Sequence, residues 1–365
     1  MLKNIIIQNY RGIKDLEIKD FKRINLLVGD NNSGKTSALE AIFALLSPTN
    51  PLALANIINK KRGEILINAK SGQETLDILS DDFWNGMTSI FNEKNTKNAI
   101  SISSEDKTNK SKSKKAVLEI SYNQDSKSFV KTNLIAESQK NFIFNFTSED
   151  GKKTETGFSN VSGNHFSDPA IKKIFGLTVT SMLFAEPKRA NDIFRLLEQY
   201  CSSLSKKQEI LKILQNLEPN LTSFDINNYI HCYFKGVNDV NDDYKLPINH
   251  LGDGIRSILA TIVNIAKYSG GACLLDEIEN GLHYKSQKLM WQQIFNVSKS
   301  ANTQIFATTH SYEMIKSLVE LCEDGIIDEK EIMLYSLDKK AGKNYVSTFD
   351  GKSLDGMISS GGEVR

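Results

Sequence analysis

A glycine-rich stretch that contains a lysine and two hydroxyl residues has the residue types and the spacing to bind phosphate. It runs from Gly29 to Thr36 and fits the pattern G-x-x-x-x-G-K-[ST]. Glycines let backbone N–H groups turn inward around phosphate oxygens, and a following helix adds partial positive charge. The Lys35 ammonium would reach the terminal phosphates, and the Thr36 hydroxyl would contact Mg²⁺. The predicted ATP contacts are Gly29, Asn31, Asn32, Ser33, Gly34, Lys35, Thr36 and Ser37.

The residues on either side of this stretch predict the strand and the helix that such a loop needs. The apolar run from Ile24 to Val28 precedes it, and Ala38 to Phe43 follows it with helical spacing. Further upstream, Lys3 to Gln8 and Leu16 to Ile18 predict two more strands, joined by a turn. Arg11 lies in that turn, either as a surface residue or as a cation near the nucleotide.

Two later apolar strands end in polar residues that suit nucleotide hydrolysis. Gly271 to Leu275 is followed by Asp276 and Glu277. Apolar strands often end in acids, but beside a phosphate loop Asp276 is predicted to hold the water shell of Mg²⁺ and Glu277 to orient or deprotonate the attacking water. The strand from Gln304 ends near His310. A lone histidine is more often structural, yet this edge of an open α/β sheet faces the ligand, so His310 is predicted to sense the γ-phosphate.

A second glycine-rich turn, Leu251 to Arg256, precedes the apolar helical run from Ile255 to Ala266. One interpretation is a helix N-cap, because Asp253 suits a helix start and glycines suit a tight turn. The other is an anion site, because the N–H groups at a helix start point outward. Gly252, Asp253 and Gly254 are therefore candidates for nucleotide binding.

Composition limits the class of protein. The chain has 365 residues, with 45 basic and 44 acidic side chains, so roughly two domains are expected and nucleic acid would need a local patch. Lys107 to Lys115 is either such a patch or a solvated hairpin loop. The four widely spaced cysteines indicate reduced thiols. Because no apolar stretch approaches the roughly 20 residues of a membrane span, we expect a cytoplasmic protein without a membrane partner.

Together these motifs resemble the ABC-type ATPase heads of the SMC, RecF and OLD (overcoming lysogenization defect) group. The resemblance implies that Gly29 to Thr36 is the Walker A loop, Asp276 the Walker B acid, Glu277 the catalytic glutamate and His310 the switch histidine. It also implies two loops at the interface with a second subunit. Leu251 to Arg256 would be the signature loop, which meets the γ-phosphate of the opposite subunit, and Glu279 to His283 would be the D-loop.

The resemblance also implies the fold class, which is α/β. We expect an ABC-type P-loop ATPase head with a mixed sheet, an antiparallel β subdomain and a helical lobe that carries the signature loop. The expected regions are an N-terminal ATPase lobe at 1–180, a helical insertion at 181–250 and a C-terminal ATPase lobe at 251–365. Apolar runs between Phe83 and Phe146 predict the antiparallel meander, and the pattern from Asn191 to Leu217 predicts two helices of about three turns.

Three features depart from the family pattern. Gly252 stands where signature loops usually carry serine, so dimer-dependent hydrolysis is expected to be slow or regulated by a partner. His283 stands where transporter D-loops have aspartate. The glutamine that normally follows the first helix has only Gln73 as a candidate.

These features favour a stand-alone ATPase that uses ATP and Mg²⁺ and dimerises around ATP as a homodimer or higher homo-oligomer. It would act as a sensor or scaffold in phage defence or DNA maintenance with a separately encoded effector, such as a TOPRIM-type nuclease. The chain has no Asp-x-Asp pair and only a short tail after His310, so we expect no TOPRIM domain of its own. A transporter engine and a RecF/SMC-like repair ATPase that binds DNA directly are the alternatives.

Overall fold

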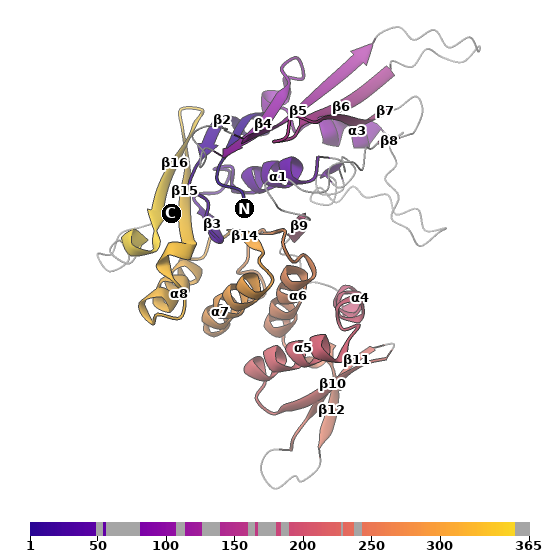
Figure 1. The fold of residues 1–365 in the computed structure, drawn as a ribbon, viewed down its shortest axis with the longest axis vertical. Helices are drawn as coiled ribbons and strands as arrows, with labels where there is room; N and C mark the ends of the chain where they lie inside the picture. The colour runs from indigo at the N-terminus through magenta and orange to yellow at the C-terminus, as the bar shows by residue number, and fades with distance from the viewer. Residues whose placement is uncertain are drawn as a thin grey trace, which may run out of the picture. The chain divides into compact units, whose positions relative to one another are not determined.

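The chain divides into two compact units, and Figure 1 draws the helices and strands of the computed structural model. The first comprises Met1–Phe21, Gly29–Thr180 and Tyr335–Thr348, and the second comprises Lys22–Val28, Ser181–Leu334 and Phe349–Arg365. The structure describes residues 1–48, 54–55, 81–106, 114–125, 139–159, 165–166, 180–183, 190–227, 229–236 and 243–354.

An antiparallel sheet of seven strands forms most of the first unit, in the order β2-β1-β4-β5-β6-β7-β8. Its strands are β1 (Ile5–Tyr10), β2 (Ile13–Ile18), β4 (Ile100–Asp106), β5 (Lys114–Asp125), β6 (Gln139–Thr147), β7 (Lys153–Ser159) and β8 (His165–Phe166). Along β5, Leu118 and Ile120 are buried while Glu119 is exposed, the alternation of a sheet with one covered face. The predicted meander is confirmed. A hairpin of β15 (Ile332–Lys340) and β16 (Lys343–Asp350) contributes Tyr335 to Thr348 to the same unit.

Helix α1 (Lys35–Leu46) packs against β1, β4 and β5 and is buried on most of its surface. The sequence-based prediction of this helix is confirmed, with about one further turn at each end. The prediction that the meander begins at Phe83 is wrong, because Phe83 lies in a helix, α3 (Asp81–Thr88). Its Trp84 and Met87 are buried three positions apart, which is helical spacing, and the Trp84 ring stacks on Phe142 with 5.7 Å between ring centroids. The short η1 (Asn92–Lys94) leads on to β4.

Parallel strands and a layer of helices form the second unit. The neighbouring strands are, in order, β15, β3 (Ile24–Val28), β14 (Gln304–Thr308), β13 (Ala272–Leu275) and β9 (Thr180–Leu183). The central strands β3, β14 and β13 are parallel and completely buried, which agrees with their continuous apolar sequences. Helices α6 (Asp253–Lys267), α7 (Tyr284–Ser300) and α8 (Tyr312–Glu323) lie side by side next to these strands (Figure 1).

Two further helices and a small sheet extend the second unit. Helices α4 (Ala190–Tyr200) and α5 (Leu204–Leu217) both pack against α6, and both also contact β10. The sheet contains β10 (Leu221–Asn227), β11 (Tyr229–Phe234) and β12 (Tyr244–Pro247), and short turns form η2 (Ile248–His250) and η3 (Glu329–Glu331). The two predicted helices are therefore confirmed. None of the helices in the described part of the chain has the length and apolar character that crossing a bilayer requires.

We predict that Trp291→Ala destabilises the protein by about 3–5 kcal/mol. Trp291 is fully buried in the core of the second unit, and its indole N–H donates to the backbone oxygen of Met314 at 3.0 Å, which joins α7 to α8. Denaturant unfolding followed by far-ultraviolet circular dichroism checks this. Leu204→Ala is the control, because Leu204 is 72% exposed and its truncation should change stability by about 0.5 kcal/mol or less. Equal losses in both variants would contradict the account of the core.

Candidate functional site

The phosphate loop belongs to the first unit, and three of its residues have positive φ angles. The φ angles of Gly29, Asn32 and Gly34 are 135°, 68° and 107°, all in the region that favours glycine. A Cβ atom at Gly29 would overlap the backbone oxygen of Leu337, so only glycine fits there. No side chain caps the N-terminus of α1, which leaves the arrangement of a helix-terminus anion site.

Lys35 and Ser33 show how this loop would accept phosphate. The Lys35 ammonium donates to the backbone oxygens of Gly29 and Asp30, at 2.7 and 2.8 Å. The Ser33 hydroxyl is buried and has no hydrogen-bond partner among the described residues. A buried polar group without a partner costs about 1–3 kcal/mol, and a phosphate oxygen would satisfy it. The loop therefore fits the phosphates of a nucleotide.

Arg11, predicted as a surface residue or a cation near the nucleotide, forms a largely buried ion pair with α1. Its Nε lies 2.8 Å from Oε2 of the fully buried Glu40, and the Tyr10 hydroxyl donates to the same oxygen at 3.2 Å. Burial, and secondly the Glu40 carboxylate, raises the pKa of Tyr10 well above its usual range, so the hydroxyl stays a donor. Nη2 of Arg11 has no partner in the described part of the chain. Its contact with nucleotide stays a prediction.

In the second unit, three parallel strands end at one edge of the sheet. The strand register sets Leu27 of β3 level with Thr308 of β14, and Ala307 of β14 level with Leu275 of β13. Asp276 and Glu277 follow β13 directly, and His310 follows β14 after one residue. Open α/β sheets bind their ligands outside this edge. The structure thus brings the two predicted acids and the predicted histidine to the same edge, as the sequence indicated.

The side chain of Thr308 joins the two acids. Its hydroxyl donates to Oδ1 of Asp276 at 2.8 Å and accepts from the backbone N–H of Glu277 at 2.7 Å. Its backbone oxygen accepts from the N–H of Ile278 at 3.0 Å. Thr308 and Asp276 are 1% and 4% exposed, so water cannot easily replace these bonds. The carboxylate of Asp276 and the backbone of Glu277 are therefore held by one buried oxygen.

The turn after β13 also contacts the predicted base and the predicted switch residue. Glu277 has a φ of 51°, and its carboxylate accepts from the Asn280 amide at 2.9 Å. The Glu279 carboxylate accepts from the backbone N–H of His310 at 2.7 Å. His310 itself is exposed at the end of β14. The predicted D-loop segment is thus hydrogen-bonded to both predicted hydrolytic residues.

The predicted signature loop forms a helix start, as its first interpretation expected, and its use as an anion site stays a prediction. Helix α6 begins at Asp253, and no side chain caps it at Gly252, so its first N–H groups keep the character of an anion site. The Asp253 carboxylate accepts from the Arg256 guanidinium. A Cβ atom added at Gly254 would lie 3.5 Å from the backbone oxygen of Gly281. The predicted signature loop and the predicted D-loop are therefore neighbours within the second unit.

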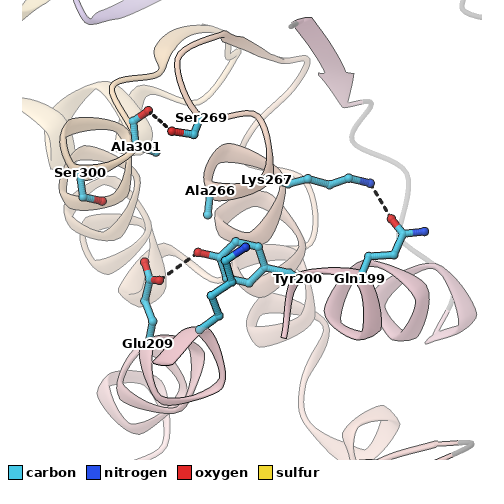
Figure 2. Close-up of a pocket in the computed structure, with 9 residues that line it drawn as sticks. Gln199, Tyr200, Glu209, Ala266, Lys267, Ser269, Ser300 and Ala301 are labelled. Carbon is cyan, nitrogen blue, oxygen red and sulfur yellow. Dashed lines mark hydrogen bonds between the residues drawn. The ribbon is translucent and has the colours of Figure 1, made fainter. Parts of the chain in front are cut away.

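A separate cavity of about 480 Å³ lies in the second unit (Figure 2). It is lined by Gln199, Tyr200, Lys206, Glu209, Ala266, Lys267, Ser269, Ser300 and Ala301. Two of its charged groups are hydrogen-bonded to neutral side chains: Tyr200 donates to Glu209 at 2.9 Å, and Lys267 donates to Gln199 at 2.7 Å. The Lys206 ammonium lies 4.9 Å from the centre of the Tyr200 ring. Since these groups satisfy one another and no predicted site residue lines the cavity, it is not the candidate site.

Sequence reasoning missed Glu40 and Thr308. Glu40 is the charged residue inside the apolar helical run from Ala38 to Phe43, and Thr308 is the hydroxyl residue at the end of an apolar strand. A polar residue in an apolar run needs a buried hydrogen-bond partner, and this pattern could have identified both residues. Gln73 and positions 107–113 of the predicted basic loop lie outside the described residues.

His283, which departs from the transporter D-loop, is the N-cap of α7. Its ring nitrogen accepts from the backbone N–H of Lys285 at 3.4 Å. This contact satisfies one of the N–H groups that a helix start leaves without an intrahelical partner. The departure at this position therefore has a local structural reason.

Three comparisons relate the chain to known proteins. Residues 24–316 match the family described as "AAA domain, putative AbiEii toxin, Type IV TA system". A Helicobacter pylori protein named ATP/GTP phosphatase is 23% identical over 359 residues, which cover 91% of this chain and 90% of that protein. The DNA replication and repair protein RecF of Clostridium botulinum is 33% identical over 78 residues, 21% of this chain and 22% of RecF.

Among solved structures, the chain is similar to an SMC head bound to the C-winged helix domain of ScpA. The TM-score is 0.52 at 12% sequence identity, and the match covers 96% of this chain and 98% of that one. At this identity the likeness concerns the fold. The predicted fold of an ABC-type P-loop ATPase head is confirmed.

We predict that Thr308→Val destabilises the protein by about 1–3 kcal/mol, because it leaves an oxygen of Asp276 and the N–H of Glu277 without their partner. The urea midpoint of unfolding measures the effect. Thr308→Ser keeps the hydroxyl and should retain more of the stability than Thr308→Val. A valine variant as stable as the wild type would show that the hydroxyl does not hold these groups.

Proposed function

Because the chain belongs to the AAA domain family matched by residues 24–316 and has the fold of an SMC ATPase head, we propose that it binds ATP and hydrolyses it to ADP and phosphate. The observation that carries the proposal is the pair of acids held by Thr308 at the end of parallel strands, in a chain with an intact phosphate loop. The name of the Helicobacter pylori relative, ATP/GTP phosphatase, supports the same reaction class.

Nucleotide binding rests on the phosphate loop. Its left-handed glycines and the uncapped start of α1 offer backbone N–H groups to the phosphates. Lys35 would exchange the backbone oxygens of Gly29 and Asp30 for the β- and γ-phosphates. The buried Ser33 hydroxyl would gain the partner that it lacks among the described residues.

Mg²⁺ would supply charge neutralisation at the β- and γ-phosphates when bound. The residues present fit this ion, because the Thr36 hydroxyl and the Asp276 carboxylate are hard oxygen donors. Mg²⁺ keeps several waters and phosphate oxygens and needs few protein ligands. The Thr308 hydroxyl would fix the orientation of the Asp276 carboxylate toward the ion's water shell.

Glu277 would accept a proton from the attacking water, and His310 would donate a hydrogen bond to the γ-phosphate. General-base catalysis of this kind contributes about 10²- to 10⁴-fold to a rate. The Glu277 backbone is fixed by Thr308 and its carboxylate by Asn280, which supports an ordered base. The exposed position of His310 at the end of β14 supports contact with a ligand.

ATP would also hold two copies of the chain together. The uncapped start of α6 at Gly252 would present N–H groups to the γ-phosphate bound by a second subunit. Gly252 supplies no hydroxyl to the γ-phosphate. The Asp253 carboxylate would repel the phosphate, but its ion pair with Arg256 neutralises this charge. Hydrolysis by the homodimer or higher homo-oligomer would therefore be slow or regulated by a partner.

The setting that we propose is cytoplasmic and linked to phage defence or DNA maintenance. The family description names a toxin of a type IV toxin–antitoxin system, which supports a defence role for this chain. The ATPase would act as a sensor or scaffold, and a separately encoded effector, such as a TOPRIM-type nuclease, would act on the target. Opening of the ATP-bound pair after hydrolysis would control that effector.

The alternative function is a repair ATPase that acts directly on DNA, favoured by the partial match to RecF. In that case the protein would be retained on DNA only with ATP, and binding would fall steeply with salt. Filter binding at several salt concentrations, with and without ATP, separates the two functions. Retention that does not depend on ATP would exclude the RecF-like mechanism.

We expect Lys35→Ala to abolish ATP binding, since it removes the cation at the terminal phosphates. Equilibrium binding of a fluorescent ATP analogue measures this. Lys14→Ala on β2, an exposed lysine of the same unit, is the control and should bind as the wild type does. Normal binding by Lys35→Ala would show that the loop does not hold the nucleotide.

For Glu277→Gln we predict that turnover falls by about 10²- to 10⁴-fold and that an ATP-bound oligomer accumulates. Phosphate release measures turnover, and size-exclusion chromatography with light scattering measures the oligomer. The wild type should form this oligomer only transiently, because hydrolysis opens it. A variant that keeps full turnover would remove Glu277 from the reaction, and a variant that stays monomeric with ATP would count against the ATP-bound pair.

A further inference from the structure

The turn that follows β13 carries two adjacent polar side chains directed at different hydrolytic residues. The Asn280 amide donates to the Glu277 carboxylate, and the Glu279 carboxylate accepts from the backbone N–H of His310. The turn itself is closed by backbone bonds from Asn280 to Glu277 at 3.1 Å and from Leu282 to Glu279 at 2.9 Å. All of these groups belong to the second unit.

We propose that Asn280 and Glu279 are positioning residues for ATP hydrolysis. Asn280 would aim the carboxylate of Glu277, and Glu279 would fix the backbone that carries His310. This proposal rests on the proposed function, since it assigns roles toward the same reaction. Neither residue needs to touch ATP, because each acts through its neighbour.

Asn280 is suited to orienting a side chain more than to stabilising the fold. It is exposed, while Glu277 is half-buried, so water can replace its hydrogen bond at little cost to folding. A carboxylate without this bond would sample several rotamers about its flexible side chain. The left-handed backbone of Glu277, with a φ of 51°, sets the direction in which its side chain leaves the turn after β13, and the Asn280 amide sets where its oxygens lie.

Glu279 makes a charge-assisted bond, which is stronger than a neutral one. The bond of 2.7 Å joins its carboxylate to the N–H of His310, and its second oxygen is buried with no hydrogen-bond partner among the described residues. His310 lies between the fully buried Thr309 and Ser311, whose hydroxyl accepts from Met314 and caps α8. Glu279 therefore secures the one short segment that connects β14 to α8.

The same turn lies beside the predicted signature loop, because a Cβ at Gly254 would be 3.5 Å from the Gly281 oxygen. A second subunit that touches this loop would also touch the residues that hold Glu277 and His310.

Asn280→Ala is expected to lower kcat roughly 10- to 100-fold, the cost of a misplaced catalytic group, without changing the KM for ATP, ATP-analogue binding or Tm. Asn227→Ala, an exposed asparagine on β10, is the matched control and should keep the wild-type kcat. Because Asn280 acts through Glu277, adding Asn280→Ala to Glu277→Gln should not lower the residual rate further.

Glu279→Ala is expected to lower kcat similarly and to speed amide hydrogen exchange in a peptide that contains His310. Glu279→Gln keeps an oxygen acceptor of the same shape and should restore most of the protection and the rate. Glu320→Gln, the same chemical change on the partly exposed face of α8, should leave kcat and the hydrogen exchange of the His310 peptide unchanged.

A wild-type kcat in Asn280→Ala would overturn the role of Asn280. The same conclusion would follow if Asn280→Ala lowered kcat by the same factor in Glu277→Gln as in the wild type. Unchanged exchange at His310 in Glu279→Ala would overturn the role of Glu279. If the wild type itself showed no turnover, the proposed function would fall together with these roles, whereas normal wild-type turnover with silent variants would overturn the positioning roles alone.

Discussion

The hydroxyl of Thr308 is the constraint on which the arrangement at the sheet edge depends. One oxygen donates to Asp276 and accepts from the backbone of Glu277, in a place that water does not reach easily. The ends of β13 and β14 therefore cannot move apart without leaving buried polar groups unpaired. A polar residue in a buried strand is costly unless its bonds are satisfied, and here both bonds go to residues proposed to carry the chemistry.

A buried cluster of charged and polar side chains lies in the first unit, which contains the phosphate loop. Glu40 on α1 holds the Arg11 guanidinium and the Tyr10 hydroxyl in a buried cluster. Burying these charges costs about as much as pairing them returns, whereas removal of one partner would leave a buried charge unpaired. The cluster ties the helix that begins in the phosphate loop to the turn between β1 and β2.

Local patterns were sufficient to predict much of the fold. The sequence predicts a strand from Ile24 to Val28 with its observed bounds, since a continuous apolar run bounded by a glycine turn has few alternatives. The helix α3 was missed because Trp84 and Met87 lie among residues with mixed spacing. The bonds from Thr308 to Asp276 and from His310 to Glu279 join residues 32 and 31 positions apart, and no local pattern encodes them. Residue types at a predicted edge indicated the site, while its hydrogen bonds required the structure.

The most direct test of the central claim is a structure of the Glu277→Gln variant with ATP and Mg²⁺. We predict that the γ-phosphate contacts Lys35 of one subunit and the start of α6 near Gly254 of the other. The glutamine introduced at position 277 should face the γ-phosphate, with Thr308 still bonded to Asp276. A nucleotide bound by Lys35 alone, with the β13 edge turned away from it and no second subunit present, would contradict the account.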